Sequence, residues 1–167
     1  MPCNCATPKP DYPATDTWGP LLWTIFHSLA ERIGTVAPMF ATDEKQRWLA
    51  LFTGFPFIIP CKDCKEHALA YISDHPFTAW KTMAPDERRE WTRSWFYNFH
   101  ESVNARLGHP TFDNTLLTST YGSVNIREYL GRLTAVINVA IQLDGVPMIK
   151  WRDFSGSVVR LLALYGI

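Results

Sequence analysis

The chain has 167 residues, enough for one domain with a sizeable core and few for two. Nearly half of the residues are apolar (47%) and 16 acidic side chains balance 16 basic ones, so a packed globular protein is expected. No stripe of Lys and Arg suggests nucleic-acid binding, and no stretch approaches the about 18–20 uncharged apolar residues of a membrane span. No secretory signal is visible at the start of the chain, so a soluble protein is expected.

The N-terminal third predicts an arm followed by two helices. Residues 1–16 contain four prolines, which disfavour regular structure, and are expected to form a flexible arm. A first helix is expected over 18–33, where apolar residues recur at helical spacing, with Asp16 or Thr17 as its cap. A second helix is expected to start after Thr42, where a cap precedes early acidic residues.

Two further helices complete a predicted bundle. The third is expected to begin at Pro60 or Cys61. The fourth and longest is expected to be capped near Ala84 and to end at Gly108. Four helices in succession, with no convincing alternating strand, predict an all-α bundle.

The chain therefore divides into three parts. Residues 1–16 form the arm, residues 17–111 the bundle, and residues 112–167 a C-terminal helical extension. Within the extension, 125–143 looks helical and 155–165 is expected to be another short helix.

Four cysteines occur in two close pairs, Cys3 with Cys5 and Cys61 with Cys64. Bridges this short close almost no loop and add little stability, so the pairs suit redox exchange or metal binding better than stapling. Cys61 follows Pro60 at an expected helix start, where partial positive charge stabilises a thiolate. This position favours cycling between dithiol and disulfide, although half a zinc site and two structural cysteines remain open.

Aromatic and histidine side chains gather on two of the predicted helices. Trp23 and His27 lie four residues apart on one face of the first helix, and His100, Val103 and Asn104 share one face of the fourth. Taken singly, each has an ordinary explanation as a core residue or a satisfied helix histidine. Together with a C-x-x-C on a third helix, they can build a pocket for a planar cofactor.

Three motifs stand in a recognisable order. They are Trp-Gly-Pro-x-x-Trp-x-x-x-His over 18–27, Pro-Cys-x-x-Cys over 60–64, and His-x-x-Val-Asn-x-x-Leu-Gly-x-Pro over 100–110. In this order and spacing the sequence, over roughly 16–113, resembles the Erv/ALR family of FAD-linked sulfhydryl oxidases. The resemblance implies an all-α four-helix bundle of Erv/ALR type that binds FAD, here with additional C-terminal helices, and usually a homodimer.

The resemblance also implies a reaction and its residues. A FAD-dependent sulfhydryl oxidase generates disulfides in protein substrates, passing electrons through Cys61 and Cys64 to FAD and then to O2, with release of H2O2. Cys64 would lie beside the isoalloxazine ring of FAD, and Cys61 would exchange with the incoming thiol. The implied cofactor-binding residues are Gly19, Trp23, His27, His100, Val103, Asn104, Leu107 and His109.

A second cysteine pair on a flexible segment is frequent in the family. By this analogy, Cys3 and Cys5 would shuttle electrons from the substrate to the core pair by thiol–disulfide exchange. The implied partners are protein thiol substrates, or a thioredoxin-like intermediary. The alternative interpretation of the arm is an exposed tail whose cysteines are incidental.

Four positions depart from the family pattern. Pro20 replaces the usual Arg, Glu101 an Asn, and His109 a Lys. Asn114 replaces a cysteine, so the family's structural disulfide at that point is absent. The Trp-Gly-Pro form and the missing disulfide look most like the viral branch, which implies the host cytoplasm or the virion; otherwise an oxidising compartment is expected.

Three other classes of protein account for parts of the sequence. A zinc-binding helical interaction module would use both cysteine pairs but leaves the Trp and His faces unexplained. A thioredoxin-like oxidoreductase would explain the C-x-x-C but requires a βαβ pattern. A purely structural helical adaptor fits the composition.

Overall fold

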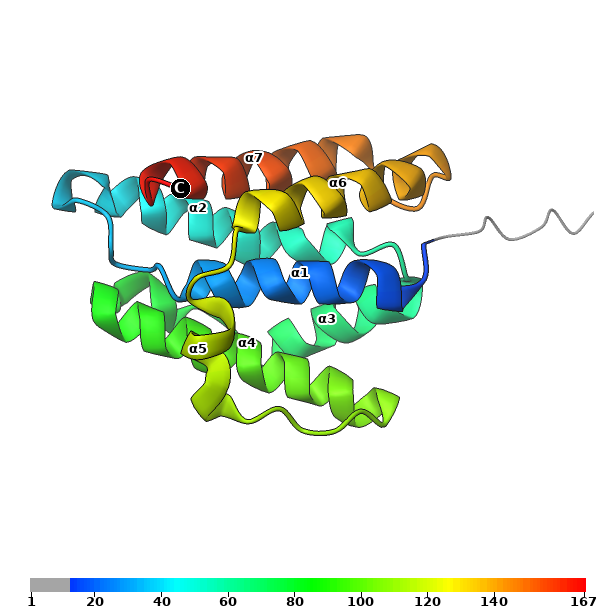
Figure 1. Ribbon diagram of the computed structural model, residues 1–167, viewed down its shortest axis with the longest axis horizontal. Coiled ribbons are helices and arrows are strands. Elements are labelled where there is room, and N and C mark those ends of the chain that lie inside the picture. Colours follow the sequence, from blue (N-terminus) through cyan, green and yellow to red (C-terminus); the bar gives the residue numbers. More distant parts are fainter. Residues whose placement is uncertain (1–12) are drawn as a thin grey trace, which may run out of the picture.

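The computed structural model of the chain describes residues 13–167 (Figure 1). This part of the chain consists of α-helices and short 3-10 turns, without a β-strand, which confirms the all-α prediction. The helices are α1 (Thr15–Ala30), α2 (Ala41–Gly54), α3 (Lys62–Asp74), α4 (Pro85–Leu107), α5 (Leu117–Tyr121), α6 (Ile126–Gln142) and α7 (Met148–Leu164).

The start of α1 differs from the sequence expectation. The helix begins at Thr15 and ends at Ala30, three residues earlier at each end than expected. Ala14 occupies the N-cap position and makes no side-chain cap bond, so neither Asp16 nor Thr17 is the cap. Asp16 instead lies within the first turn, where its negative charge favours the positive end of the helix dipole.

The C-terminal extension holds the largest differences. Helix α7 begins directly after Pro147, seven residues before the expected start at 155. Its first two turns carry Trp151 and Phe154, which are buried on the same face as Val158. Helix α5 was not expected, because five residues are too few to show a helical period.

The helices stack in layers (Figure 1). Helices α6 and α7 cover α1 and α2 on one side, and α3, α4 and α5 lie on the opposite side of α1. No helix in the described part of the chain is long and apolar enough to cross a membrane.

Aromatic side chains join these layers into one core. Phe26 of α1 has no exposed surface and stacks on Phe96 of α4, with ring centroids 4.5 Å apart. The ring of Phe154 in α7 meets Phe26 edge-on at 6.1 Å, and Phe55 meets it at 5.3 Å. Because Phe26 contacts both sides, α7 and α4 share a single hydrophobic core across α1.

A buried carboxylate fastens the C-terminus to α2. Glu44 is 2% exposed, and its Oε1 accepts hydrogen bonds from the Gly34 N–H at 2.9 Å and the Tyr165 hydroxyl at 2.8 Å. The Trp48 indole N–H donates to the same hydroxyl at 2.9 Å. Gly34 has φ of 80°, so glycine suits the turn that ends α1. The network therefore ties α2, this turn and the end of α7 together.

Candidate redox site

The two central cysteines form a disulfide at the start of α3. Cys61 and Cys64 are bonded, with Cα atoms 5.2 Å apart. Cys61 is the N-cap residue, and its Sγ accepts a hydrogen bond from the Cys64 N–H at 3.2 Å. The helix start predicted from Pro60 and Cys61 is confirmed. At this position the positive end of the helix dipole favours a thiolate formed when the disulfide is reduced.

A small cavity of about 40 Å3 lies between α1, α3 and α4 beside this disulfide. Cys64 lines the cavity and Cys61 does not. Trp18, Trp23 and Phe99 contribute aromatic surface to its wall. Of the two cysteines, Cys64 is therefore the one that faces the interior of the bundle.

A larger cavity of about 410 Å3 adjoins the small one. Both are lined by Thr15, Gly19, Trp23 and Val103, so they form neighbouring parts of one hollow. The larger part brings together seven of the residues predicted from the sequence to bind a cofactor: Gly19, Trp23, His100, Val103, Asn104, Leu107 and His109. Thus α1 and α4 supply facing walls, with the disulfide at one end.

A stack of rings forms one wall of the larger cavity. Trp23 lies parallel to His100, with centroids 4.2 Å apart and an angle of 10°. His27 Nε2 lies 3.2 Å from His100 Nδ1, and the ring of Tyr121 stacks on His27 at 4.7 Å. His27 is 3% exposed and lines neither cavity. It therefore lies behind the wall and holds His100 in place.

Both histidines are held neutral. Burial, together with the neighbouring His100, lowers the pKa of His27 to about 3. Burial likewise lowers the pKa of His100 to about 4, which the Glu101 carboxylate opposes and His109 reinforces. At neutral pH one ring therefore donates and the other accepts the proton in the bond between them.

Glu101, one of the departures from the family pattern, positions an amide of the site. Its Oε1 accepts hydrogen bonds from Asn104 Nδ2 at 2.8 Å and from the Phe112 N–H at 3.2 Å. The carboxylate thus fixes the Asn104 side chain at the cavity and ties down the segment after α4. Glu101 therefore stands where the family pattern has an Asn, and its carboxylate orients the Asn104 amide.

The residues present fit a planar, partly polar cofactor. Gly19 is buried, and a Cβ there would meet nothing closer than Thr15 at 3.8 Å, so the chain's own packing does not require glycine. The absent side chain widens both cavities. The indole N–H of Trp18, which lines the small cavity, is buried without a hydrogen-bond partner among the described residues. A donor of this kind is normally satisfied, so its site suits an acceptor from a ligand.

Sequence reasoning missed Tyr121, which lines the larger cavity from α5. Its helix is too short for a periodic pattern, and the only local signal was an aromatic residue before Gly122. Cys3 and Cys5 lie outside the described residues. No group of three His, Cys, Asp or Glu side chains that could hold a metal ion occurs between residues 13 and 167.

The fold and the site define a helical-bundle protein whose C-x-x-C disulfide borders an aromatic cavity. Residues 20–122 match the Erv1/Alr family, and the chain belongs to that family. The resemblance inferred from the three motifs is thereby confirmed.

The similar proteins are viral and mitochondrial. A FAD-linked sulfhydryl oxidase of African swine fever virus is 28% identical over 54% of this chain and 67% of its own length. Protein 347L of Invertebrate iridescent virus 6 is named "Putative FAD-linked sulfhydryl oxidase". It is 29% identical to this chain over 56% of this chain and 81% of its own length. The mitochondrial FAD-linked sulfhydryl oxidase ERV1 of Saccharomyces cerevisiae is 30% identical over 68% of this chain and 54% of its own. No solved structure matches the chain significantly.

Proposed function

We propose that this protein is a FAD-linked sulfhydryl oxidase that makes disulfides in protein substrates. The observation that carries the proposal is the shared hollow, in which Cys64 borders a cavity that continues into the one lined by Trp23 and His100. Family membership supports the same activity. The zinc-binding module is not favoured, because family membership accounts for the Trp and His faces that a zinc site leaves unexplained.

The two cysteines take different parts in the exchange. A substrate thiolate attacks Cys61 Sγ, the Cys61–Cys64 bond breaks, and Cys64 leaves as a thiolate stabilised by the start of α3. The second substrate thiol, as its thiolate, then attacks the mixed disulfide. This step forms the substrate disulfide, releases Cys61, and leaves two electrons on the Cys61 and Cys64 pair. Only Cys64 lines the cavity, so it is the donor of these electrons.

FAD, when bound, supplies the acceptor for two electrons and their transfer to O2 with release of H2O2. The residues that would hold it are Gly19, Trp23, His100, Val103, Asn104, Leu107, His109 and Tyr121. Tyr121 joins this set from the structure, while His27 supports it through His100.

Substrates and compartment are proposed here from the relatives. Proteins with exposed thiol pairs are the proposed partners, with a thioredoxin-like protein as an intermediary, and Cys3 and Cys5 as a shuttle to Cys61. The viral relatives favour the host cytoplasm or the virion. The homodimer stays a prediction. Because α6 and α7 cover α1 and α2 within one chain, a second copy would have to meet another surface.

The test is an absorption spectrum of the purified protein, repeated after addition of dithiothreitol under air while oxygen uptake is followed. A flavin spectrum that bleaches, with oxygen consumed, is expected. Both bleaching by dithiol and oxygen uptake should be lost in Cys64→Ser and in Cys61→Ser. Cys3→Ser/Cys5→Ser should slow the oxidation of a reduced protein and leave the rate of dithiothreitol oxidation unchanged. A colourless protein that FAD cannot reconstitute would refute the proposal, and zinc at one equivalent would support the interaction module.

A further inference from the structure

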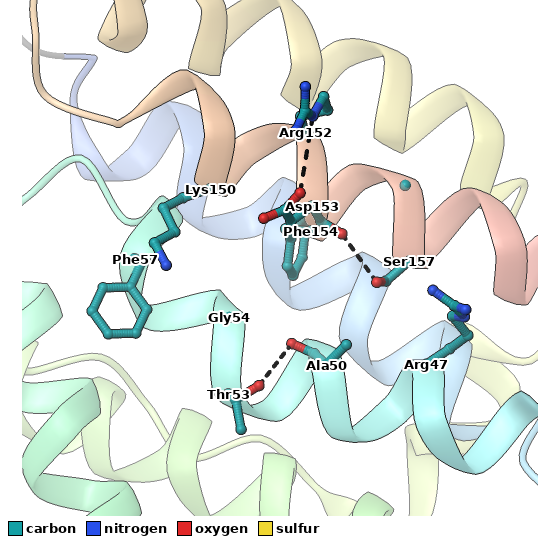
Figure 2. A pocket seen from close by; sticks show the side chains of 11 residues that line it. Arg47, Ala50, Thr53, Gly54, Phe57, Lys150, Arg152, Asp153, Phe154 and Ser157 are labelled. Atoms are coloured by element: carbon teal, nitrogen blue, oxygen red, sulfur yellow. Dashed lines mark hydrogen bonds and ion pairs between the residues drawn. The ribbon is translucent and has the colours of Figure 1, made fainter.

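A groove of about 700 Å3 lies on the far side of α2 from the histidine wall, between α2 and α7. Figure 2 shows Lys150 and Phe57 at one end and Arg47 at the other, with Ala50 and Ser157 between them on the facing helices. None of its lining residues belongs to the two cavities beside the disulfide. The proposed oxidase reaction leaves this groove unused.

Its floor is made of small residues. Gly54 and Gly156 both line the groove, and a Cβ at either position would meet nothing within 4 Å. Gly156 stands inside α7, where glycine is less favourable than alanine. The chain's own packing gains nothing from these glycines. The open space above them can admit the backbone of another polypeptide.

The rim carries more positive than negative charge. The Asp43 carboxylate is shared by Arg47 at 3.2 Å and Arg160 at 2.7 Å. Arg152 lies 3.9 Å from Asp153, and the Lys150 ammonium lies 5.2 Å from the centre of the Phe57 ring. Among the lining residues, three cations (Arg47, Lys150 and Arg152) thus meet one carboxylate (Asp153), in a chain whose formal charge is zero, while Asp43 and Arg160 lie beyond the lining. This local excess is complementary to an acidic ligand.

One end of the groove leads to the redox pair. Phe57 stands four residues before Cys61, so their Cα atoms are at most about 14 Å apart. The 3-10 turn Phe55–Ile58 packs against α7, α2 and α3 and so connects the groove to the helix that begins at the disulfide. The apolar side chain at this end is Phe57, which is 38% exposed.

We propose that the groove docks an acidic, extended segment of the protein substrate, which then presents its cysteine to Cys61. The carboxylates of the segment meet Arg47, Lys150 and Arg152, its backbone lies over Gly54 and Gly156, and an apolar residue near its cysteine rests on Phe57. The inference rests on the proposed oxidase function, which gives the docking its purpose. It leaves the proposed chemistry at Cys61 unchanged.

The test measures docking apart from turnover. Two fluorescein-labelled peptides carry Ser-x-x-Ser in place of the dithiol and differ only in four flanking residues, Glu or Gln. Fluorescence anisotropy at low ionic strength gives their Kd values for the full-length protein. The Glu peptide is expected to bind about tenfold more tightly, and the preference should shrink as salt is raised. Equal Kd values for the two peptides would overturn the proposal.

Charge-reversal variants locate the site. Lys150→Glu/Arg152→Glu should abolish the preference for the Glu peptide. Lys81→Glu/Arg132→Glu, at exposed positions outside the groove, should keep it. A groove variant that retains the preference would contradict the proposal. So would a groove variant that only changes the oligomeric state in sedimentation, since that would make the groove a surface for a second copy.

A matched pair of glycine variants tests the floor. Gly156→Met fills the groove and should weaken binding of the Glu peptide about tenfold. Gly131→Met, on α6, also faces open space and should leave binding unchanged. Oxidation of dithiothreitol by all these variants should equal that of the unmodified protein. Absence of that oxidation in the unmodified protein would refute the oxidase function, while the peptide Kd values still decide the docking.

Discussion

Buried histidines set how the stability of the protein depends on pH. His27 and His100 have pKa values lowered to about 3 and about 4, whereas in the unfolded chain both would titrate near 6.5. Between pH 6.5 and 4 these two histidines are therefore protonated in the unfolded chain but stay neutral in the folded chain. The contribution to the free energy of unfolding is full above pH 6.5. It decreases as the pH is lowered, by up to about 1.4 kcal/mol per pH unit for each histidine.

The prediction is that His27→Gln flattens this pH dependence. The free energy of unfolding, measured in urea at pH 7, 6 and 5, should fall less steeply in the variant because one of the two linked protons is gone. His75→Gln, at an exposed position at the end of α3, serves as the matched control and should keep the full slope. Equal slopes for His27→Gln and the unmodified protein would show that His27 is not held neutral.

At the scale of single residues, the sequence predicted which side chains carry chemistry better than it predicted which residues surround them. Trp23, His100 and Asn104 carry motif signals, and the structure brings them to one cavity. The contact of Tyr121 with His27 and the unpartnered donor on Trp18 became visible only in three dimensions, because the residues around them come from distant parts of the chain. The bond of Glu101 to the Phe112 backbone depends on how the chain turns after Gly108, which spacing alone does not encode.

Among the elements, α5 is held by two arginines, of which Arg32 donates to the Gly122 carbonyl at its end at 3.0 Å. The other, Arg93 of α4, bonds Glu31 at the end of α1 at 2.7 Å, Glu90 at 3.0 Å and Thr118 of α5 at 2.9 Å. Thr118 in turn donates to Glu31 at 3.1 Å. The network therefore holds α5 against α1, and with it the Tyr121 ring against His27.

Arg93→Met should release α5. It leaves the Glu31 carboxylate, 10% exposed, without its cation, and should cost about 2 kcal/mol of unfolding free energy, less than a fully buried pair because Arg93 is 22% exposed. Retention of FAD on dilution should also fall as Tyr121 loosens. Arg132→Met, which removes an exposed arginine above Tyr129, should change the unfolding free energy by less than about 0.5 kcal/mol. A stable Arg93→Met that holds FAD normally would exclude this role.

Helix existence was predictable and helix boundaries were less so. The third and fourth helices begin where Pro60, Cys61 and Ala84 indicate, since proline and capping positions act locally. The early start of α7 was missed although Trp151, Phe154 and Val158 stand at helical spacing on its buried face; Arg152, Asp153 and Gly156 lie on the exposed face between them. Tertiary contacts with α2 decide that boundary, and they are not local in sequence.

At the scale of the whole molecule, the C-terminal helices are part of the core. The family match ends at residue 122, just before α6 begins. Yet Phe154 meets Phe26, and Tyr165 bonds both Trp48 and Glu44. The sequence showed helices in this region without a motif to say where they pack, so their position over α1 and α2 came only from the structure.

A chain ending at residue 122 is therefore predicted not to fold as a stable monomer. It loses large side chains that α6 and α7 bury: Leu130, Leu133, Ile137, Trp151, Phe154, Val158, Leu161 and Leu162. Each is worth about 1.5–3 kcal/mol, and their sum of about 12–24 kcal/mol matches or exceeds the about 5–15 kcal/mol by which a domain is stable. Circular dichroism melting and size-exclusion chromatography should show loss of a cooperative transition, or self-association of the uncovered α1 and α2. Tyr165→Phe, which keeps both helices and removes one hydroxyl from the Glu44 network, should keep the oligomeric state of the unmodified protein and lose only about 1–3 kcal/mol. A monomeric, cooperatively melting 1–122 chain would mean that α6 and α7 cover a domain that is already complete.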